Sequence, residues 1–307
     1  MSKISLTAIA LAAALTTTAL LNGAAAAAVK VDTVNYKQGD TALEGWLVYD
    51  DAKQGKRPGV VIFPAWFGPT AEEKESAEKL AKMGYVAFVA DVYGKGVRPN
   101  NPKDAGAESG KYMKDRPLLT QRAQAALEQL RKSPMVNTAK IAAIGYCFGG
   151  AGALDLARSG APLKAVVTFH GSLTSPTPQD DKNIKGRVLA LHGADDPLVG
   201  PQAQDAFKKE MTDAKVDWQL VLYSGAVHAF TEKSAGNDPS KGAAYNEKAD
   251  KRSWQETPTS CRRMNRGGGR SPSSSSRRPT RGRARERRGR RGGSHRRSRP
   301  RRRSSAA

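Results

Sequence analysis

The sequence predicts an α/β fold in which a mainly parallel sheet carries helices on both faces. Three short, continuous apolar runs at 59–63, 85–90 and 164–169 have the length of strands. Runs of this kind are typical of strands that are covered on both faces. They alternate along the chain with longer segments that have the periodicity of amphipathic helices. This alternation indicates crossover connections, which join parallel strands of one sheet.

The apolar runs and the residues that interrupt them predict the elements in order. Thr70 and Glu73 have the spacing of a capping box, so a helix begins there. Residues 95–115 are rich in Gly, Pro, Asn and Lys and are expected to form a loop that could fold over a site. Strands are expected at 29–37, 42–49, 59–63, 85–90, 141–144, 164–169, 187–192 and 216–223. Helices are expected at 70–83, 118–131, 149–159 and 202–211, and from 243 to about 255.

Composition divides the chain into three parts, of which residues 1–28 have the pattern of a secretory signal peptide. Lys3 precedes a mostly apolar stretch, and five alanines precede Val29, the expected first mature residue. Residues 29–255 hold the expected elements and form the folded domain. Export predicts a periplasmic or secreted protein without a membrane segment after cleavage. An uncleaved anchor is the alternative, although the apolar run is short for one.

The formal net charge of +22 is concentrated in the third part, residues 256–307. This tail has nineteen arginines and two glutamates, a charge of +17, which leaves +5 for the other 255 residues. It is rich in Arg, Ser, Gly and Pro and cannot bury a core, so it is predicted to be disordered. The tail could bind polyanions, but no specific nucleic-acid site is expected. Lysine disappears where the last helical pattern stops, which favours a reading-frame shift as the origin of the tail.

The candidate chemistry is organised around residues 141–150. An apolar strand leads into Gly-Tyr-Cys-Phe-Gly at 145–149, and a helix of small residues follows. The spacing is that of a nucleophile on a tight turn, where flanking glycines let strand and helix backbones approach. The helix N-terminus favours the thiolate of Cys147. Cys261 lies in an unrelated context, so a free thiol is expected rather than a disulfide. A buried structural cysteine is the alternative.

An acid and a base follow Cys147 in the chain order of an α/β-hydrolase triad. Asp196 stands in a Gly-x-x-Asp-x-x-Val turn after a strand, with Asp195 as the alternative acid. His228 lies in the loop after the last expected strand, whereas His192 lies within a strand and is expected to be structural. In this hypothesis Cys147 attacks an ester carbonyl, His228 transfers the proton, and Asp196 orients His228.

The remaining candidates surround this triad. The backbone N–H groups of Phe148 and Trp66 are the expected donors to an oxyanion, because one follows the nucleophile and the other lies in the loop after the 59–63 strand. Phe67, His170 and Phe230 are candidates for the pocket wall. No metal site is predicted.

Residues 29–255 resemble the dienelactone hydrolase family. The resemblance lies in Gly-Tyr-Cys-x-Gly-Gly at the elbow, Asp-Val-Tyr at 91–93, Gly-x-x-Asp-x-x-Val at 193–199 and Gly-x-x-His-x-Phe at 225–230. It implies an α/β-hydrolase fold without a separate lid domain, the same three triad residues, no cofactor, and hydrolysis of small esters or lactones.

Three positions depart from the family pattern. Members that open dienelactone have a glutamate where this chain has Ala65, and two arginines that hold the substrate carboxylate. The first arginine corresponds roughly to Lys95 and the second to Glu232. Lysine lacks the bidentate fork of arginine, and a charged glutamate would repel a carboxylate. We therefore expect a small neutral ester or lactone, rather than dienelactone, to be the main substrate.

The sequence thus predicts an exported, monomeric hydrolase of small esters or lactones that works through a thioacyl-enzyme. Two other classes of function stay open. One is a hydrolase-like protein that binds a ligand without turnover, because Ala65 leaves the thiol unready. The other is a polyanion or nucleic-acid binder that acts through the basic tail.

Overall fold

An eight-stranded sheet forms the centre of residues 28–262, the part of the chain that the computed structural model describes. The strand order is β1-β2-β4-β3-β5-β6-β7-β8. The β1–β2 and β2–β4 pairs are antiparallel and every other neighbouring pair is parallel, which confirms the expected mainly parallel sheet. The strands are β1 Val29–Gln38, β2 Thr41–Asp50, β3 Arg57–Phe63, β4 Val86–Val89, β5 Val136–Tyr146, β6 Ala165–Phe169, β7 Arg187–Gly193 and β8 Trp218–Tyr223.

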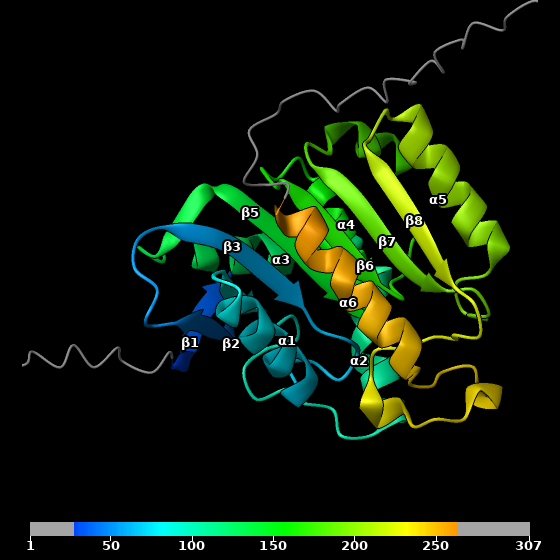
Figure 1. Cartoon of the computed structure of the whole chain (residues 1–307), viewed down its shortest axis with the longest axis horizontal. Coiled ribbons are helices and arrows are strands. Elements are labelled where there is room, and N and C mark those ends of the chain that lie inside the picture. The colour runs from blue at the N-terminus through cyan, green and yellow to red at the C-terminus, as the bar shows by residue number, and fades with distance from the viewer. Residues whose placement is uncertain (1–27, 263–307) are drawn as a thin grey trace, which may run out of the picture. The chain divides into compact units, whose positions relative to one another are not determined.

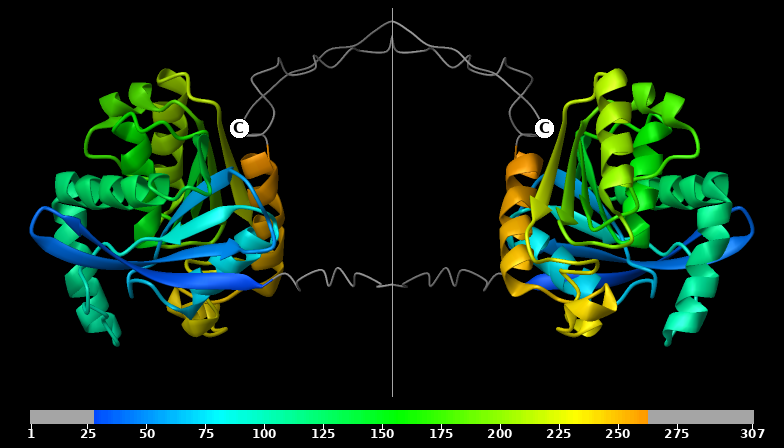
Figure 2. Two further views of the ribbon diagram at one scale, coloured as in Figure 1. Left: turned by 90° about the vertical axis from the view of Figure 1, so that its left-hand side faces the viewer. Right: turned by 90° about the vertical axis from the view of Figure 1, so that its right-hand side faces the viewer.

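Helices cover both faces of this sheet. Figure 1 shows α1 and α6 in front of the strands and α3 and α4 behind them. In the side views of Figure 2 the sheet is strongly twisted, so that β1 and β2 are steeply inclined to β7 and β8. The α-helices are α1 Ala71–Lys82, α2 Pro102–Lys114, α3 Arg116–Arg131, α4 Phe148–Arg158, α5 Pro201–Asp213 and α6 Glu247–Arg262. Three short 3-10 turns occur at Pro178–Asn183, Lys233–Ala235 and Pro239–Lys241.

Each face of the sheet has its own apolar core, and successive residues of one strand serve different cores. Val61 and Phe63 of β3 pack on the side of α3 and α4, whereas Val60 and Ile62 pack on the side of α1 and α6. A central strand with two buried faces has no position for a polar side chain. This is why β3 reads in the sequence as a continuous apolar run rather than an alternating one.

The expectation that residues 95–115 form a loop is wrong, because most of this segment is helix α2. Asn101 caps the helix by accepting a hydrogen bond from the Asp104 amide at 3.0 Å, and Pro102 occupies the first turn. Both are helix-start signals, since proline there loses no helical hydrogen bond. Two glycines inside the segment, Gly106 and Gly110, hide the helical pattern.

The expected end of the folded domain at residue 255 is also wrong, because α6 continues to Arg262. Thr257 lies in the expected tail but is buried, and its hydroxyl donates to the carbonyl of Ser253 at 3.1 Å. The helix begins at Glu247 rather than at 243. Residues 1–27 and 263–307 lie outside the described part of the chain, as do the predictions made for them. Within residues 28–262, no helix has the length and apolarity needed to cross a membrane.

The turn between β5 and α4 requires glycine at positions 145 and 149, where two backbone segments lie too close together for a Cβ atom. A Cβ on Gly149 would overlap the carbonyl oxygen of Phe63 at the end of β3, and a Cβ on Gly145 would overlap the carbonyl of Gly149. Neither backbone can move away, because β3 and β5 are hydrogen-bonded neighbours. The two glycines therefore hold the elbow against the loop that follows β3.

We expect Gly149→Ala to lower the free energy of unfolding by at least about 3 kcal/mol, since the added methyl meets backbone rather than a movable side chain. Gly152→Ala in the same helix is the matched control, because its Cβ would meet only side chains at ordinary contact distances from 3.5 Å. Urea denaturation followed by circular dichroism measures both. Equal midpoints for the two variants would show that the elbow does not need this close approach.

Candidate functional site

Cys147 lies on the turn between β5 and α4, at the carboxyl edge of the parallel strands. Its φ of 48° is unusual for a residue with a side chain. Its amide donates to the carbonyl of Phe169 at 3.0 Å, and its own carbonyl accepts from the Gly150 amide at 3.0 Å. These bonds hold the strained turn in place, and the thiol stays partly exposed.

The structure brings Cys147, His228 and Asp196 into one chain of hydrogen bonds. Nε2 of His228 lies 3.1 Å from Sγ of Cys147, and Nδ1 lies 2.9 Å from Oδ2 of Asp196. The other oxygen of Asp196 accepts from the amides of Leu198 and Val199 at 2.8 and 3.1 Å. The carboxylate is thus fixed by its own turn, and the imidazole is fixed by the carboxylate.

Within these three hydrogen-bonded side chains, each charged group shifts the pKa of its neighbour toward the charged form. Burial alone would lower the pKa of His228, but its hydrogen bonds to Asp196 and Cys147 raise that pKa well above its usual range. Burial alone would raise the pKa of Asp196, but hydrogen bonds from His228 and two amides lower it. Both shifts favour an imidazolium held between a carboxylate and a sulfur. A sulfur beside a cationic histidine is suited to act as a thiolate nucleophile.

The alternative residues lie elsewhere. Asp195 is exposed, and its carboxylate accepts from the Gly225 amide at 3.0 Å instead of contacting His228. His192 is buried in β7, and burial lowers its pKa to about 4. His170 is fully buried and packs its ring against that of His228, with centroids 5.2 Å apart. Nε2 of His170 lies 2.8 Å from the hydroxyl of Thr231.

Cys147 and His228 open into a cavity of about 990 Å³. Trp66 and Phe67 line it, as expected, and their rings make an edge-to-face contact with centroids 5.3 Å apart. Apart from Glu232, the sequence did not indicate the residues of the other walls. These additional lining residues include Trp46, Glu72, Arg98, Pro99, Pro102, Leu198 and Glu232. The cavity has a mainly apolar and aromatic wall, which suits a small organic molecule.

Three expected pocket residues do not line this cavity. Lys95 is exposed and its Nζ contacts Asn35 at 2.7 Å, because the turn after β4 directs it away from the site. His170 lies behind His228, and Phe230 is fully buried with its ring centroid 5.2 Å from that of His170. Both side chains are buried in the core, and the ring of His170 packs between those of His228 and Phe230 instead of facing the cavity.

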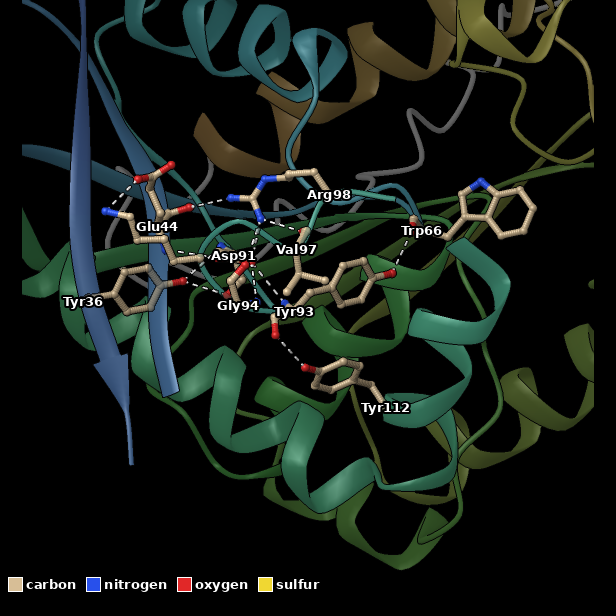
Figure 3. Close-up of polar contacts among 10 residues, drawn as sticks. Tyr36, Glu44, Trp66, Asp91, Tyr93, Gly94, Val97, Arg98 and Tyr112 are labelled. Atoms are coloured by element: carbon tan, nitrogen blue, oxygen red, sulfur yellow. Dashed lines mark hydrogen bonds and ion pairs between the residues drawn. The ribbon is translucent and has the colours of Figure 1, made fainter. Parts of the chain in front are cut away.

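Arg98 lines the cavity in place of Lys95, but its guanidinium turns toward buried Asp91, as Figure 3 shows. Nη1 lies 3.4 Å from Asp91 Oδ1 and donates to the carbonyls of Gly94 and Val97. Nη2 donates to the carbonyl of Glu44 at 3.2 Å. Most of the guanidinium donors are therefore engaged outside the cavity.

Trp66 belongs to a loop that two buried side chains hold from either side. The carboxylate of Glu73 accepts from the Ala65 amide at 3.2 Å, and the hydroxyl of Tyr93 donates to the Trp66 carbonyl at 2.8 Å (Figure 3). Burial raises the pKa of Tyr93, so its hydroxyl stays a neutral donor. These bonds fix the peptides on both sides of the Trp66 N–H. None of the hydrogen bonds within residues 28–262 uses that N–H.

This geometry brings together a candidate nucleophile, base and acid and two backbone N–H groups. The N–H of Phe148 is the first of α4 and has no acceptor within the helix. Together with the Trp66 N–H it is suited to receive a negatively charged oxygen. Sequence reasoning assigned Glu73 only to a helix cap and gave Tyr93 no role. The available signal for Tyr93 was its place after a buried strand, at the same sheet edge as the elbow.

The comparisons with known proteins identify the family of this fold. The model of the dienelactone hydrolase family matches residues 43–263. The chain belongs to the dienelactone hydrolase family. The match confirms the resemblance, the α/β-hydrolase fold and the prediction of a hydrolase.

This chain matches two relatives of known structure over nearly the whole length of each relative. A structure named m3DLH is 40% identical, with a TM-score of 0.74, over 77% of this chain and 98% of its own. A dienelactone hydrolase-like promiscuous phosphotriesterase from metagenomic libraries is 41% identical, with a TM-score of 0.73, over 78% and 98%. An uncharacterized protein of Caenorhabditis elegans is 38% identical over 145 residues, which are 45% of this chain and 89% of that protein.

Glu232, which the resemblance places at the position of a family arginine, has an unusual environment in the cavity wall. It is 8% exposed, and its Oε1 has no hydrogen-bond partner within the described residues. Nε2 of His170 lies 3.9 Å away, but burial and the charge of His228 hold the pKa of His170 well below its usual range. Burial, and then the charges of Glu73 and Glu72, raise the pKa of Glu232 to about 8. The expected repulsion of a carboxylate by Glu232 therefore requires a pH above about 8.

No group of three or more His, Cys, Asp or Glu side chains within the described ranges is arranged to hold a metal ion. The acids near Glu232 therefore form an electrostatic environment rather than a coordination shell.

The raised pKa of Glu232 gives folding stability a pH dependence. Below its ordinary pKa of 4.5 the group is protonated in both the folded and unfolded chains. As pH rises from 4.5 to the folded value of about 8, the folded state loses stability, because only the unfolded chain has released this proton. We expect Glu232→Gln to remove this loss, so that the variant exceeds the native chain by about 5 kcal/mol above pH 9 and matches it near pH 4.

Thermal unfolding monitored across this pH range measures the difference. Glu128→Gln is the matched control, since Glu128 is an exposed acid on α3 whose side chain is 61% accessible. Parallel pH profiles for the native chain and Glu232→Gln would contradict the assignment.

Proposed function

We propose that this protein hydrolyses small esters or lactones through Cys147, His228 and Asp196. The observation that carries the proposal is the hydrogen-bonded chain of these three side chains, of which Cys147 and His228 open into the cavity. The family supports a hydrolase, and the aromatic wall supports a small organic substrate.

The reaction would proceed in two steps. The Cys147 thiolate attacks the carbonyl carbon, and the N–H groups of Phe148 and Trp66 stabilise the oxyanion. The His228 imidazolium gives its proton to the departing alkoxide, which leaves a thioacyl-enzyme and an alcohol. Water then attacks the thioester carbonyl as His228 takes the proton from water, and the acid and the thiolate are released. Asp196 keeps the imidazole oriented throughout.

Dienelactone itself is not proposed as the main substrate. Lys95 lies outside the cavity, the guanidinium of Arg98 is engaged by Asp91, and Glu232 stands where the family has an arginine. A substrate carboxylate would therefore find no uncommitted cation among the described cavity side chains. A dienelactone hydrolysed as fast as p-nitrophenyl acetate would refute this part of the proposal.

Phosphotriester hydrolysis is a second candidate. It is favoured by the printed activity of the metagenomic relative at 41% identity, together with a wide apolar cavity that suits a neutral triester. Thiolate attack at phosphorus would expel the aryloxide, and water would then release the phosphoryl group. Paraoxon in the same substrate panel tests this activity.

The cellular location and the oligomeric state are proposed from the sequence alone. We propose that residues 1–28 direct export and that the folded part acts in the periplasm or outside the cell as a monomer. We also propose that the basic tail is not required for this chemistry, since the triad and the cavity residues of the described part of the chain lie within residues 28–255.

The first prediction from this function concerns the triad. We expect Cys147→Ala and His228→Ala to abolish covalent labelling by an ester-like probe, and Asp196→Asn to lower kcat on the order of 10³-fold. Asp195→Asn is the matched control, since Asp195 binds an amide away from His228. Intact-protein mass spectrometry and p-nitrophenyl acetate kinetics provide the readouts. Probe binding without covalent mass would favour the hydrolase-like binding protein over the enzyme.

The second prediction concerns Tyr93, which acts as a positioning residue through Trp66. We expect Tyr93→Phe to lower kcat roughly three- to tenfold with KM little changed, because only the oxyanion donor loses its support. Tyr49→Phe removes a hydroxyl bonded to Asp32 on the outer strands and should change neither constant. A rise in KM at constant kcat would assign Tyr93 to the pocket wall instead.

A further inference from the structure

The cavity beside Cys147 combines aromatic rings with acidic groups that lack a cation. Trp46, Trp66 and Phe67 line it from β2 and from the loop after β3, and Glu72 and Glu232 line it from α1 and the loop after His228. We name these five residues the acidic aromatic subsite. The family resemblance places an arginine where this subsite has Glu232, so its charge is of the opposite sign.

Neither acid is neutralised by the protein. Among the described side chains, neither Glu72 nor Glu232 forms an ion pair with a lysine or an arginine. Oε1 of Glu72 accepts from the Ser234 amide at 3.0 Å, and the nearest basic group to Glu232 is the neutral ring of His170 at 3.9 Å. Glu232 is more than nine-tenths buried and its Oε1 lacks any partner. A buried carboxyl oxygen without a donor is costly, and a ligand cation would lower that cost.

The single arginine of the wall does not compensate these acids. Arg98 donates to Asp91 and to backbone carbonyls on the far side, which leaves its charge balanced by Asp91. The lysines of this region, Lys79 and Lys233, lie near Glu75 at 2.9 and 3.8 Å rather than in the cavity wall. Above about pH 8, where Glu232 is ionised, the acidic side of the cavity therefore carries two carboxylates that no lysine or arginine of the described residues pairs with.

From this arrangement we propose that the acidic aromatic subsite binds the cationic part of the substrate, so that the preferred substrates are esters bearing a quaternary ammonium or similar weakly hydrated cation. Aromatic faces attract such cations, and the effect grows when the cation is desolvated. A cation without N–H donors needs no hydrogen-bond partners, which suits a wall that offers rings and carboxylates. This inference rests on the proposed ester hydrolysis and specifies its substrate class.

The test compares two esters of equal shape and different charge. Butyrylcholine carries a trimethylammonium group, and 3,3-dimethylbutyl butyrate has a neutral tert-butyl group in its place. Acid release in a pH-stat follows both without a thiol reagent that would modify Cys147. The assay runs at pH about 9, where Glu232 is ionised. Glu72 and Glu73 of α1, His170 and His228 also face Glu232. On its other side Glu232 shares a small pocket with Lys79, Tyr146, Lys233 and Asp250.

We expect kcat/KM for butyrylcholine to exceed that for the neutral ester about tenfold. Glu232→Gln and, separately, Glu72→Gln should each lower this ratio several-fold. Glu128→Gln, which removes the same charge from exposed α3, should leave the ratio unchanged.

A ratio of one or less in the native chain would overturn the proposal, as would a ratio that all three variants leave unchanged. An equal fall in Glu128→Gln would also overturn it, because that would assign the effect to net charge. If neither ester nor p-nitrophenyl acetate is hydrolysed, the proposed ester hydrolysis fails, and the substrate class fails with it.

Discussion

The close approach of the elbow to the end of β3 is the constraint on which the rest of the site depends. Gly149 lies against the carbonyl of Phe63, so the turn that carries Cys147 and the loop that carries Trp66 are held together by backbone contact. Backbone in hydrogen-bonded strands cannot yield as a side chain can. The proposed nucleophile and the proposed oxyanion donor come from different parts of the sequence, and this contact keeps them at a fixed separation, which is what pre-organised catalysis requires.

Buried polar groups extend this rigidity outward from the elbow. The carboxylate of Asp91 accepts from the amides of Glu44, Tyr93 and Gly94, and Tyr36 both donates to and accepts from the Asp91 backbone. Each of these groups would be costly to leave unpaired in the core, so the network has few alternative arrangements. Because Tyr93 also holds the Trp66 carbonyl, the geometry of the oxyanion loop depends on a carboxylate outside the cavity.

The charged residues of the cavity wall and the residues of the triad lie on different parts of the fold. The triad and its backbone donors occupy the strand ends and depend on the sheet, whereas Glu72, Arg98 and Glu232 lie on a helix and loops. Loop and helix-face residues can change without disturbing the core. The charge of the wall is therefore separable from the chemistry of Cys147, and family membership alone does not define the substrate.

The sequence by itself determined the parallel sheet, the elbow and the order of the triad, because continuous apolar runs and fixed glycine spacing are local properties. It also placed Asp196 and His228 at strand ends, which the sheet then gathers at one edge. Only the tertiary structure decided that Asp196 rather than Asp195 meets His228, that Lys95 points away, and that Tyr93 and Glu73 hold the Trp66 loop. Those outcomes depend on side-chain direction and on contacts between distant segments, which no local pattern encodes.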